Sequence, residues 1–147
     1  MGIQSLPMLL SLLAAAIPLS EPQPMAEERF QQWLLESDLQ QLERGCTDPL
    51  IGATGGRQQE IRDRLLVLHP APESFELVMA NATALLTCGS PDSAARVLNR
   101  ISPAMGEERR RWLRLRWQAA AAGLDHREAA LALRRLVNGD LIALASL

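Results

Sequence analysis

The densest group of side chains that could do chemistry is the run RRRWLRLRW at residues 109–117. Residues three and four apart share one face of a helix, which places Arg110, Leu113, Arg114 and Trp117 together. Guanidinium groups bind carboxylates and phosphates through paired hydrogen bonds. Such a face, with an exposed indole beside its guanidinium groups, would suit a carboxylate, a phosphate or an anionic membrane surface.

An ordinary solvated helix face is the alternative for the same run. Its arginines would then pair with Glu107, Glu108 and the acidic N-terminal half, and Trp117 would be buried against the next helix. A second face, formed by Trp112, Leu115 and Ala119, is predicted to face the core in either case.

Cys46 and Cys88 are the only cysteines. If the chain is exported, they can form a disulfide that closes a loop of about 40 residues and adds ~3–4 kcal/mol. In the cytosol they would be free thiols, and both states remain open. His69 and His126 complete four potential zinc ligands, but no zinc-motif spacing links them, so we predict no metal site.

No catalytic constellation is visible. The chain has no G-x-S-x-G element, and the carboxylates at 107, 108, 125 and 128 lie at predicted helix starts, where capping explains them. The GATGGR segment at residues 52–57 lacks the lysine of a phosphate-binding loop and is expected to be a flexible loop. We predict that the protein is not an enzyme and binds no cofactor.

Composition indicates an all-α protein. Of its 147 residues, 48% are hydrophobic and only 3% aromatic, and leucine and alanine, both good helix formers, supply most of the apolar content. Charge is divided unevenly along the chain. Residues 1–95 hold 5 arginines and 12 acids, whereas residues 96–147 hold 10 arginines and 5 acids. The two halves could attract each other, or mark a polar partner surface.

Two similar helix–turn–helix units are predicted at residues 74–102 and 107–137. Gly89 and Gly123 lie 34 residues apart, each expected to end a first helix in the left-handed conformation. Capping residues follow each glycine, Ser90-Pro91-Asp92 in the first unit and Asp125 with Glu128 in the second. The second turn is expected to be one residue longer. Self-similarity at this period is typical of stacked helical hairpins.

This block resembles the tetratricopeptide-repeat family. Arg116 and Asn81 depart from it, since the family prefers a small residue and a leucine there. The resemblance implies antiparallel hairpins stacked as a short solenoid and a scaffold that binds a protein partner. The first helix of each repeat would line an inner groove, making Glu76, Met79 and Thr83 neighbours of the arginine face. The resemblance is carried by Trp112, Leu115, Ala82, Gly89, Ala94, Leu98, Ile101, Gly123, Ala129, Leu133 and Leu136.

Residues 1–20 are apolar and uncharged apart from the terminal amine. Three interpretations remain open: a cleaved export signal, an uncleaved anchor, and a helix packed on the fold. Membrane contact is expected only through this segment. A proline-rich linker at 21–25 precedes a single helical domain at 26–147. That domain is expected to begin with a helix over 26–44, stopped by Gly45 and breakable at Ser37-Asp38, then a loop and a helix over 57–68.

The sequence thus predicts a non-catalytic helical-repeat scaffold, exported if residues 1–20 are a signal peptide and cytoplasmic otherwise. Partner-binding residues are predicted to be Arg110, Leu113, Arg114, Trp117, Glu76 and Met79. Two alternatives remain: the N-terminal segment of a larger repeat protein, suggested by the apolar tail LIALASL at residues 141–147, and a cytosolic arginine-rich nucleic-acid-binding domain. The partner and the oligomeric state are left open.

Overall fold

The computed structural model describes residues 16–52, 55–69, 74–138 and 145. These residues form seven α-helices and no β-strand, which confirms the all-α prediction. Most of the predicted export segment and of the apolar tail lies outside the described residues. Residues 16–26 form no helix or strand, and no described helix is long and apolar enough to cross a membrane. The helices are α1 (Glu27–Glu36), α2 (Leu39–Thr47), α3 (Arg57–Val67), α4 (Phe75–Thr87), α5 (Pro91–Leu98), α6 (Glu107–Ala122) and α7 (His126–Val137).

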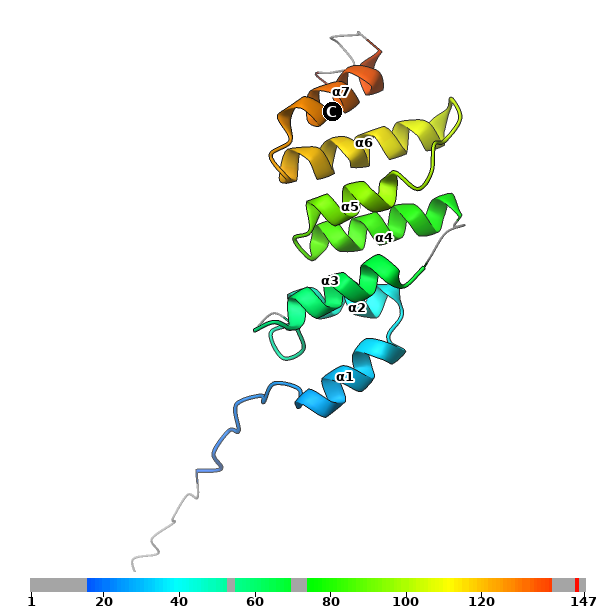
Figure 1. The fold of residues 1–147 in the computed structure, drawn as a ribbon. Coiled ribbons are helices and arrows are strands. Elements are labelled where there is room, and N and C mark those ends of the chain that lie inside the picture. Colours follow the sequence, from blue (N-terminus) through cyan, green and yellow to red (C-terminus); the bar gives the residue numbers. More distant parts are fainter. Residues whose placement is uncertain (1–15, 53–54, 70–73, 139–144, 146–147) are drawn as a thin grey trace, which may run out of the picture.

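The helices are stacked in chain order, from α1 at one end to α7 at the other (Figure 1). Consecutive antiparallel pairs are α2 with α3, α4 with α5 and α6 with α7, and each pair packs on the next. Helix α4 packs against both α2 and α6, so these three helices form one continuous layer. The two predicted hairpins therefore touch, through α5 and α6 as well as through α4 and α6.

The turn after α4 is built as the glycine rule predicts. Gly89 has a φ of 69°, in the left-handed region. Its N–H donates to the carbonyl of Leu86 at 2.9 Å, and the N–H of Ser90 donates to Leu85 at 2.8 Å. Helix α5 then begins at Pro91, a residue suited to the first helical position.

The turn after α6 has the same hydrogen bonds but a different residue in the left-handed position. The N–H groups of Leu124 and Asp125 donate to the carbonyls of Ala121 and Ala120, at 3.2 and 2.8 Å. Leu124 has a φ of 59°, whereas Gly123 has a φ of −84°. Gly123 ends α6 as predicted, but the left-handed conformation expected for it belongs to Leu124.

The two turns are therefore equivalent at a spacing of 35 residues, with Leu124 at the position of Gly89. The prediction of a longer second turn is wrong, because it aligned the two glycines instead of the two left-handed residues. Gly123 serves close packing: a Cβ there would lie 3.3 Å from the Asp92 carboxylate and 3.3 Å from the Ala119 carbonyl.

The helix predicted over 26–44 is divided in two at Ser37-Asp38, the position where the sequence allowed a break. Asp38 accepts a hydrogen bond from the N–H of Gln41, whose side chain accepts one from the N–H of Asp38, both at 2.8 Å. This reciprocal capping box starts α2 as a separate helix.

Gly45 does not stop α2, contrary to the prediction. The helix continues to Thr47, and a Cβ on Gly45 would lie 2.3 Å from the Trp33 ring. Gly52, expected in a flexible loop, is buried, and its Cβ would meet the Gly45 carbonyl oxygen at 2.7 Å. Both glycines are therefore required by close packing around the end of α2.

A single apolar core runs through the stack, and the predicted core face of Trp112, Leu115 and Ala119 is buried in it. The Trp112 indole donates to the Leu98 carbonyl at 2.9 Å, joining α6 to the end of α5. Asn81 is fully buried, and neither polar atom of its amide has a hydrogen-bond partner within the described structure. The largest apolar side chains of this core are Phe30, Leu42, Ile61, Leu65, Val78, Leu85, Val97 and Leu98.

Candidate functional site

The predicted binding face of α6 is only partly open. Leu113 is 3% exposed and lines neither hollow of the groove described below, and Trp117 is half-buried. The physical reason is that α6 packs against α5 on one side and α7 on the other, and needs apolar residues on more than one face. Arg110 is exposed and pairs with Glu107 of its own helix at 2.7 Å.

The open face of α6 is rotated by about one residue from the predicted one. Arg111, Arg114, Leu115 and Gln118, at helical steps of three and four, line a hollow of 240 Å³ together with residues of α4. Of the predicted arginines, only Arg114 lies in this hollow. The α4 residues that complete it are Met79 and Thr83.

A second hollow of 340 Å³ extends the first across α4 to α2. The two hollows share Met79, Thr83 and Arg111, so they form one continuous surface. Glu76 and Met79 both line this surface. We call this surface the groove; it is lined by Leu39, Gln40 and Glu43 of α2, Glu76, Met79, Ala80 and Thr83 of α4, and Arg111, Arg114, Leu115 and Gln118 of α6.

An ion pair between Glu76 and Arg111 bridges α4 and α6 inside the groove. The two guanidinium NH₂ groups donate to the two carboxylate oxygens, at 2.7 and 3.1 Å. This hydrogen bonding from Arg111 lowers the pKa of Glu76 below its ordinary value and raises the pKa of Arg111. The Arg111 guanidinium also lies 5.1 Å from the centre of the Phe75 ring. The sequence placed Glu76 beside Arg110, one residue away from its true partner.

Two other charged side chains of the groove, Glu43 and Arg114, have fewer hydrogen-bond or ion-pair partners among the described residues. Glu43 is half-buried, and its Oε1 accepts a hydrogen bond from the Thr87 hydroxyl at 2.8 Å. Arg114 is exposed and has no hydrogen bond or ion pair with any described residue. Met79 and Leu115, 9% and 7% exposed, form an apolar floor between these charges.

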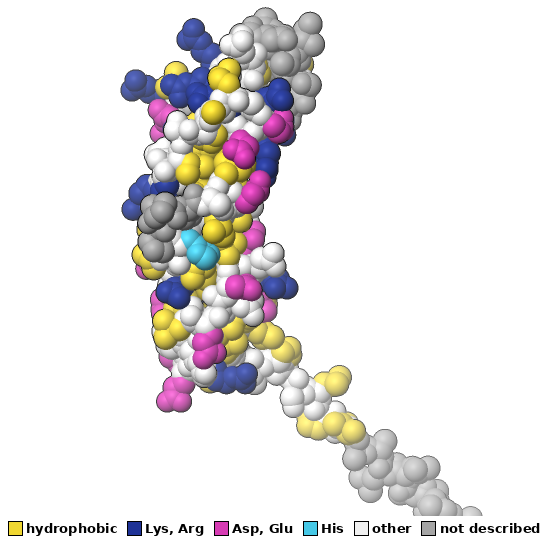
Figure 2. Space-filling view, turned by 90° about the vertical axis from the view of Figure 1, so that its right-hand side faces the viewer, with side chains coloured by type: hydrophobic (Ala, Val, Ile, Leu, Met, Phe, Trp, Pro, Cys, Tyr) yellow, Lys and Arg dark blue, Asp and Glu magenta, His cyan; other side chains and the backbone are white. Residues whose placement is uncertain are grey.

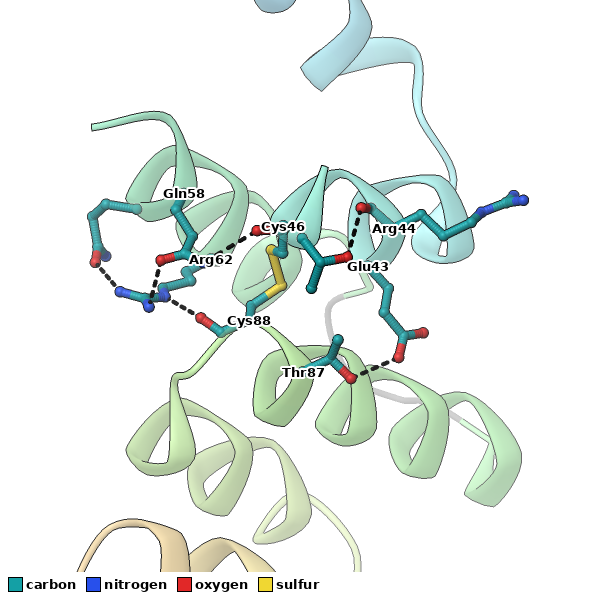
Figure 3. The surroundings of a disulfide bond; sticks show 9 residues. Glu43, Arg44, Cys46, Gln58, Arg62, Thr87 and Cys88 are labelled. Atoms are coloured by element: carbon teal, nitrogen blue, oxygen red, sulfur yellow. Dashed lines mark hydrogen bonds between the residues drawn. A yellow bond between two sulfur atoms is a disulfide. The ribbon is translucent and has the colours of Figure 1, made fainter. Parts of the chain in front are cut away.

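The walls formed by α2 and α4 are tied together by a disulfide between Cys46 and Cys88 (Figure 3). The two Cα atoms are 5.3 Å apart, both side chains are buried, and neither cysteine is free. Helix α3 supports the bond from outside. Arg62 donates to the Cys88 carbonyl at 2.5 Å, and the Gln58 amide donates to the Cys46 carbonyl at 3.2 Å. Of the two states that the sequence left open, a disulfide or two free thiols, the structure contains the disulfide.

A further hollow of 330 Å³ lies between α5, α6 and α7, but structural contacts explain most of its polar groups. Asp125 caps α7 by accepting from the N–H of Glu128 at 3.1 Å. Arg116 pairs with Glu128 at 3.5 Å, bonds to the Asn99 side chain and lies 4.6 Å from the centre of the Trp112 ring. The described residues contain no group of three or more His, Cys, Asp or Glu side chains arranged to hold a metal ion.

Sequence reasoning missed the contribution of α2 to the groove and the role of Arg111. The available signal was the capping pair Asp38 and Gln41, which would have separated α2 from α1 and given a third helix–turn–helix unit. The choice between Arg110 and Arg111 had no such signal, because Trp112, Leu113, Leu115 and Trp117 place apolar residues on most sides of α6.

Comparison with known proteins returns no match to this chain among protein-family models, curated proteins or solved structures. The functional evidence is therefore the geometry of the groove and the contacts of its side chains.

Proposed function

We propose that this chain is a non-catalytic helical-repeat scaffold that binds a segment of a protein partner along the groove. The observation that carries the proposal is the continuity of the groove over α2, α4 and α6, with an apolar floor and an arginine, Arg114, that has no partner among the described residues. Concave surfaces with a few convergent polar groups are the usual sites of recognition. A protein segment suits a shallow surface of this length better than a small molecule does.

A tetratricopeptide-like arrangement is part of this proposal. It has three hairpins, α2–α3, α4–α5 and α6–α7, one more than the two counted in the sequence. The equivalence of the turns after α4 and α6 at 35 residues supports it. So does the position of α2, α4 and α6, the first helices of the three hairpins, on one surface, as the family resemblance implies for an inner groove.

Export is also part of the proposal. Buried disulfides form and persist in oxidising compartments, and Cys46 and Cys88 are bonded in the core. The apolar segment at residues 1–20 would supply the signal. Mass measurement of the mature protein from its native cell tests both: a chain that retains residues 1–20 and has two free thiols would contradict export.

The partner site is tested by two matched substitutions on α6. Arg114→Gln removes the groove charge that has no described partner, whereas Arg110→Gln removes another exposed arginine of α6 that lies outside the groove. Since hydrogen bonds to charged groups contribute about 1.5–3 kcal/mol, we expect Arg114→Gln to weaken partner capture about tenfold or more. Arg110→Gln should leave it unchanged. Equal capture by both variants, measured on the disulfide-bonded protein, would reject the groove as the site.

Nucleic acid is less well supported as a partner. The chain itself satisfies several arginines of the basic run: Arg109 donates to the Pro103 carbonyl, and Arg111 pairs with Glu76. Few donors of the run are therefore left for a phosphate backbone. Binding of DNA or RNA that weakens steeply with salt would favour this alternative.

A further inference from the structure

The groove differs in charge between its two ends. The hollow between α4 and α6 is lined by Arg111 and Arg114 and by no acidic residue. The hollow between α2 and α4 is lined by Glu43 and Glu76, with Arg111 as its only cation. The α6 end is therefore electropositive and the α2 end electronegative, although the groove as a whole is neutral.

The ion pair in the middle of the groove leaves the unlike charges at its two ends. Glu76 and Arg111 neutralise each other in the middle of the groove, at 2.7 and 3.1 Å. The charges left to meet a ligand are Arg114, which has no described partner, and Glu43, of which Oε2 accepts no described hydrogen bond. One unpaired cation at one end and one unpaired carboxylate oxygen at the other select for opposite charges in the occupant.

The helix spacing sets the distance between those charges. Packed helices lie about 8–10 Å apart, so the two steps from α2 through α4 to α6 span about 16–20 Å. An extended chain rises about 3.3 Å per residue, which corresponds to about five or six residues. Between the two ends lies the floor of Met79 and Leu115, which suits one apolar side chain.

We propose that the groove binds an extended peptide segment whose basic residue meets Glu43 and whose acidic residue, about five or six positions away, meets Arg114, with an apolar residue between them over Met79. This inference rests on the proposed function, since it names the partner chemistry of the same groove. Polarity fixes the direction and register in which the segment lies, which apolar contact alone would leave free.

The test is selection from a display library of random peptides on the disulfide-bonded protein. Enriched peptides should carry a base and an acid at the stated spacing around an apolar residue. Their affinity should fall about tenfold with Arg114→Gln and with Glu43→Gln, which keeps an acceptor for Thr87. Arg110→Gln is the matched control and should leave affinity unchanged. The double reversal Glu43→Arg with Arg114→Glu should prefer the same peptides with their two charges exchanged.

Ala80→Trp separates failure of this inference from failure of the proposed function, because it fills the α2 side of the groove from an exposed position. One outcome is that the enriched peptides lose binding to Ala80→Trp but lack the charge pair and bind Arg114→Gln as tightly as the wild type. That outcome would contradict the proposed charge pairing and still support the groove as a binding site. Enrichment that Ala80→Trp does not reduce, or no enrichment at all, would overturn the proposed function and this inference together. Circular dichroism of each variant checks that the fold is retained.

Discussion

Leu124 holds the backbone conformation that Gly89 holds in the equivalent turn. A left-handed φ costs a residue with a Cβ about 1–2 kcal/mol, and glycine avoids that cost. Leu124 is 74% exposed, so its side chain contributes little burial in return. Leu124→Gly should therefore raise the free energy of unfolding by about 1 kcal/mol, measured by urea denaturation.

Gly89→Ala is the reciprocal substitution, because it introduces a Cβ at the equivalent left-handed position. It places a Cβ at a φ of 69°, and that atom would lie 3.0 Å from the Arg62 guanidinium. We expect it to lower stability by about the amount that Leu124→Gly adds. If both variants had the wild-type free energy of unfolding, the left-handed conformation would carry no energetic cost for a residue with a Cβ in these two turns.

The Glu76–Arg111 pair gives the groove a pH dependence. The pKa of Glu76 is lowered in the folded protein, mainly by the hydrogen bond from Arg111. A lowered carboxyl pKa means that the pair's contribution is present above the ordinary glutamate value of about 4.3 and is lost as the pH falls through the folded value. NMR titration should show Glu76 protonating below that value, and Arg111→Gln should return its pKa to the ordinary range. An unshifted Glu76 in the wild type would contradict the pairing.

At this scale the sequence predicted residue types better than contacts. The core face of α6 is buried as expected, and Glu76, Met79 and Arg114 line the groove. The arginine that lines the groove beside Arg114 is Arg111, one residue from the predicted Arg110, and one residue rotates a helix face by about 100°. Gly45 and Gly52 were taken as breaks in structure, because nothing in a sequence reveals that another backbone or ring approaches a glycine closely.

At the scale of elements, the disulfide holds the first hairpin against the second. Cys46 lies in the last turn of α2 and Cys88 directly follows α4, 42 residues further along the chain. Replacing both with alanine should lower the free energy of unfolding by about 3–4 kcal/mol, because the unfolded chain regains the entropy of that loop. Chemical denaturation should give the same free energy of unfolding for this variant as for the wild-type protein measured with its disulfide reduced. A loss below about 1 kcal/mol would mean that helix packing alone sets the position of α2.

Helix boundaries were predictable wherever a local signal marks them. Capping residues and prolines placed the starts of α5 and α7, and the glycine-containing turns placed the ends of α4 and α6, close to where they lie. The arrangement of α2 beside α4 was not predictable, since it depends on contacts between residues far apart in the chain. The disulfide, the Thr87–Glu43 hydrogen bond and the Arg62 contact all belong to that class.

For the whole molecule, the uneven charge of the sequence becomes a difference between two ends. The acid-rich half forms α1 to α4 and the start of α5, and the arginine-rich half forms α6 and α7 (Figure 1). Figure 2 shows arginine side chains gathered towards the α7 end of the stack. Because helices are stacked in order, α1 and α7 lie at opposite ends. The predicted attraction between the halves is therefore limited to local pairs such as Glu76–Arg111.

Stacking in chain order also predicts an uneven resistance to unfolding. In a linear stack each helix is stabilised by its neighbours, so an end helix with one neighbour opens most easily. Helix α7 packs mainly against α6, and its buried residues are Ala132 and Val137, whereas α4 packs against α2, α3, α5 and α6. Helix α1, at the opposite end, packs mainly against α3 and more sparsely than α7 packs on α6. Hydrogen exchange followed by mass spectrometry should therefore show the amides of α1 and α7 exchanging first and those of α4 last.

The alanine replacements of Cys46 and Cys88 make that measurement selective. Without the disulfide, exchange should accelerate in α2, which loses its covalent tie to α4, and in α3, which packs on α2, while α7 keeps its own rate because it packs mainly against α6. Such a result would mean that the α2 wall of the groove depends on oxidation, whereas the α6 wall depends on packing with α5 and α7. Equal protection along all seven helices, and equal acceleration on removing the disulfide, would instead mean that the stack unfolds as one cooperative unit.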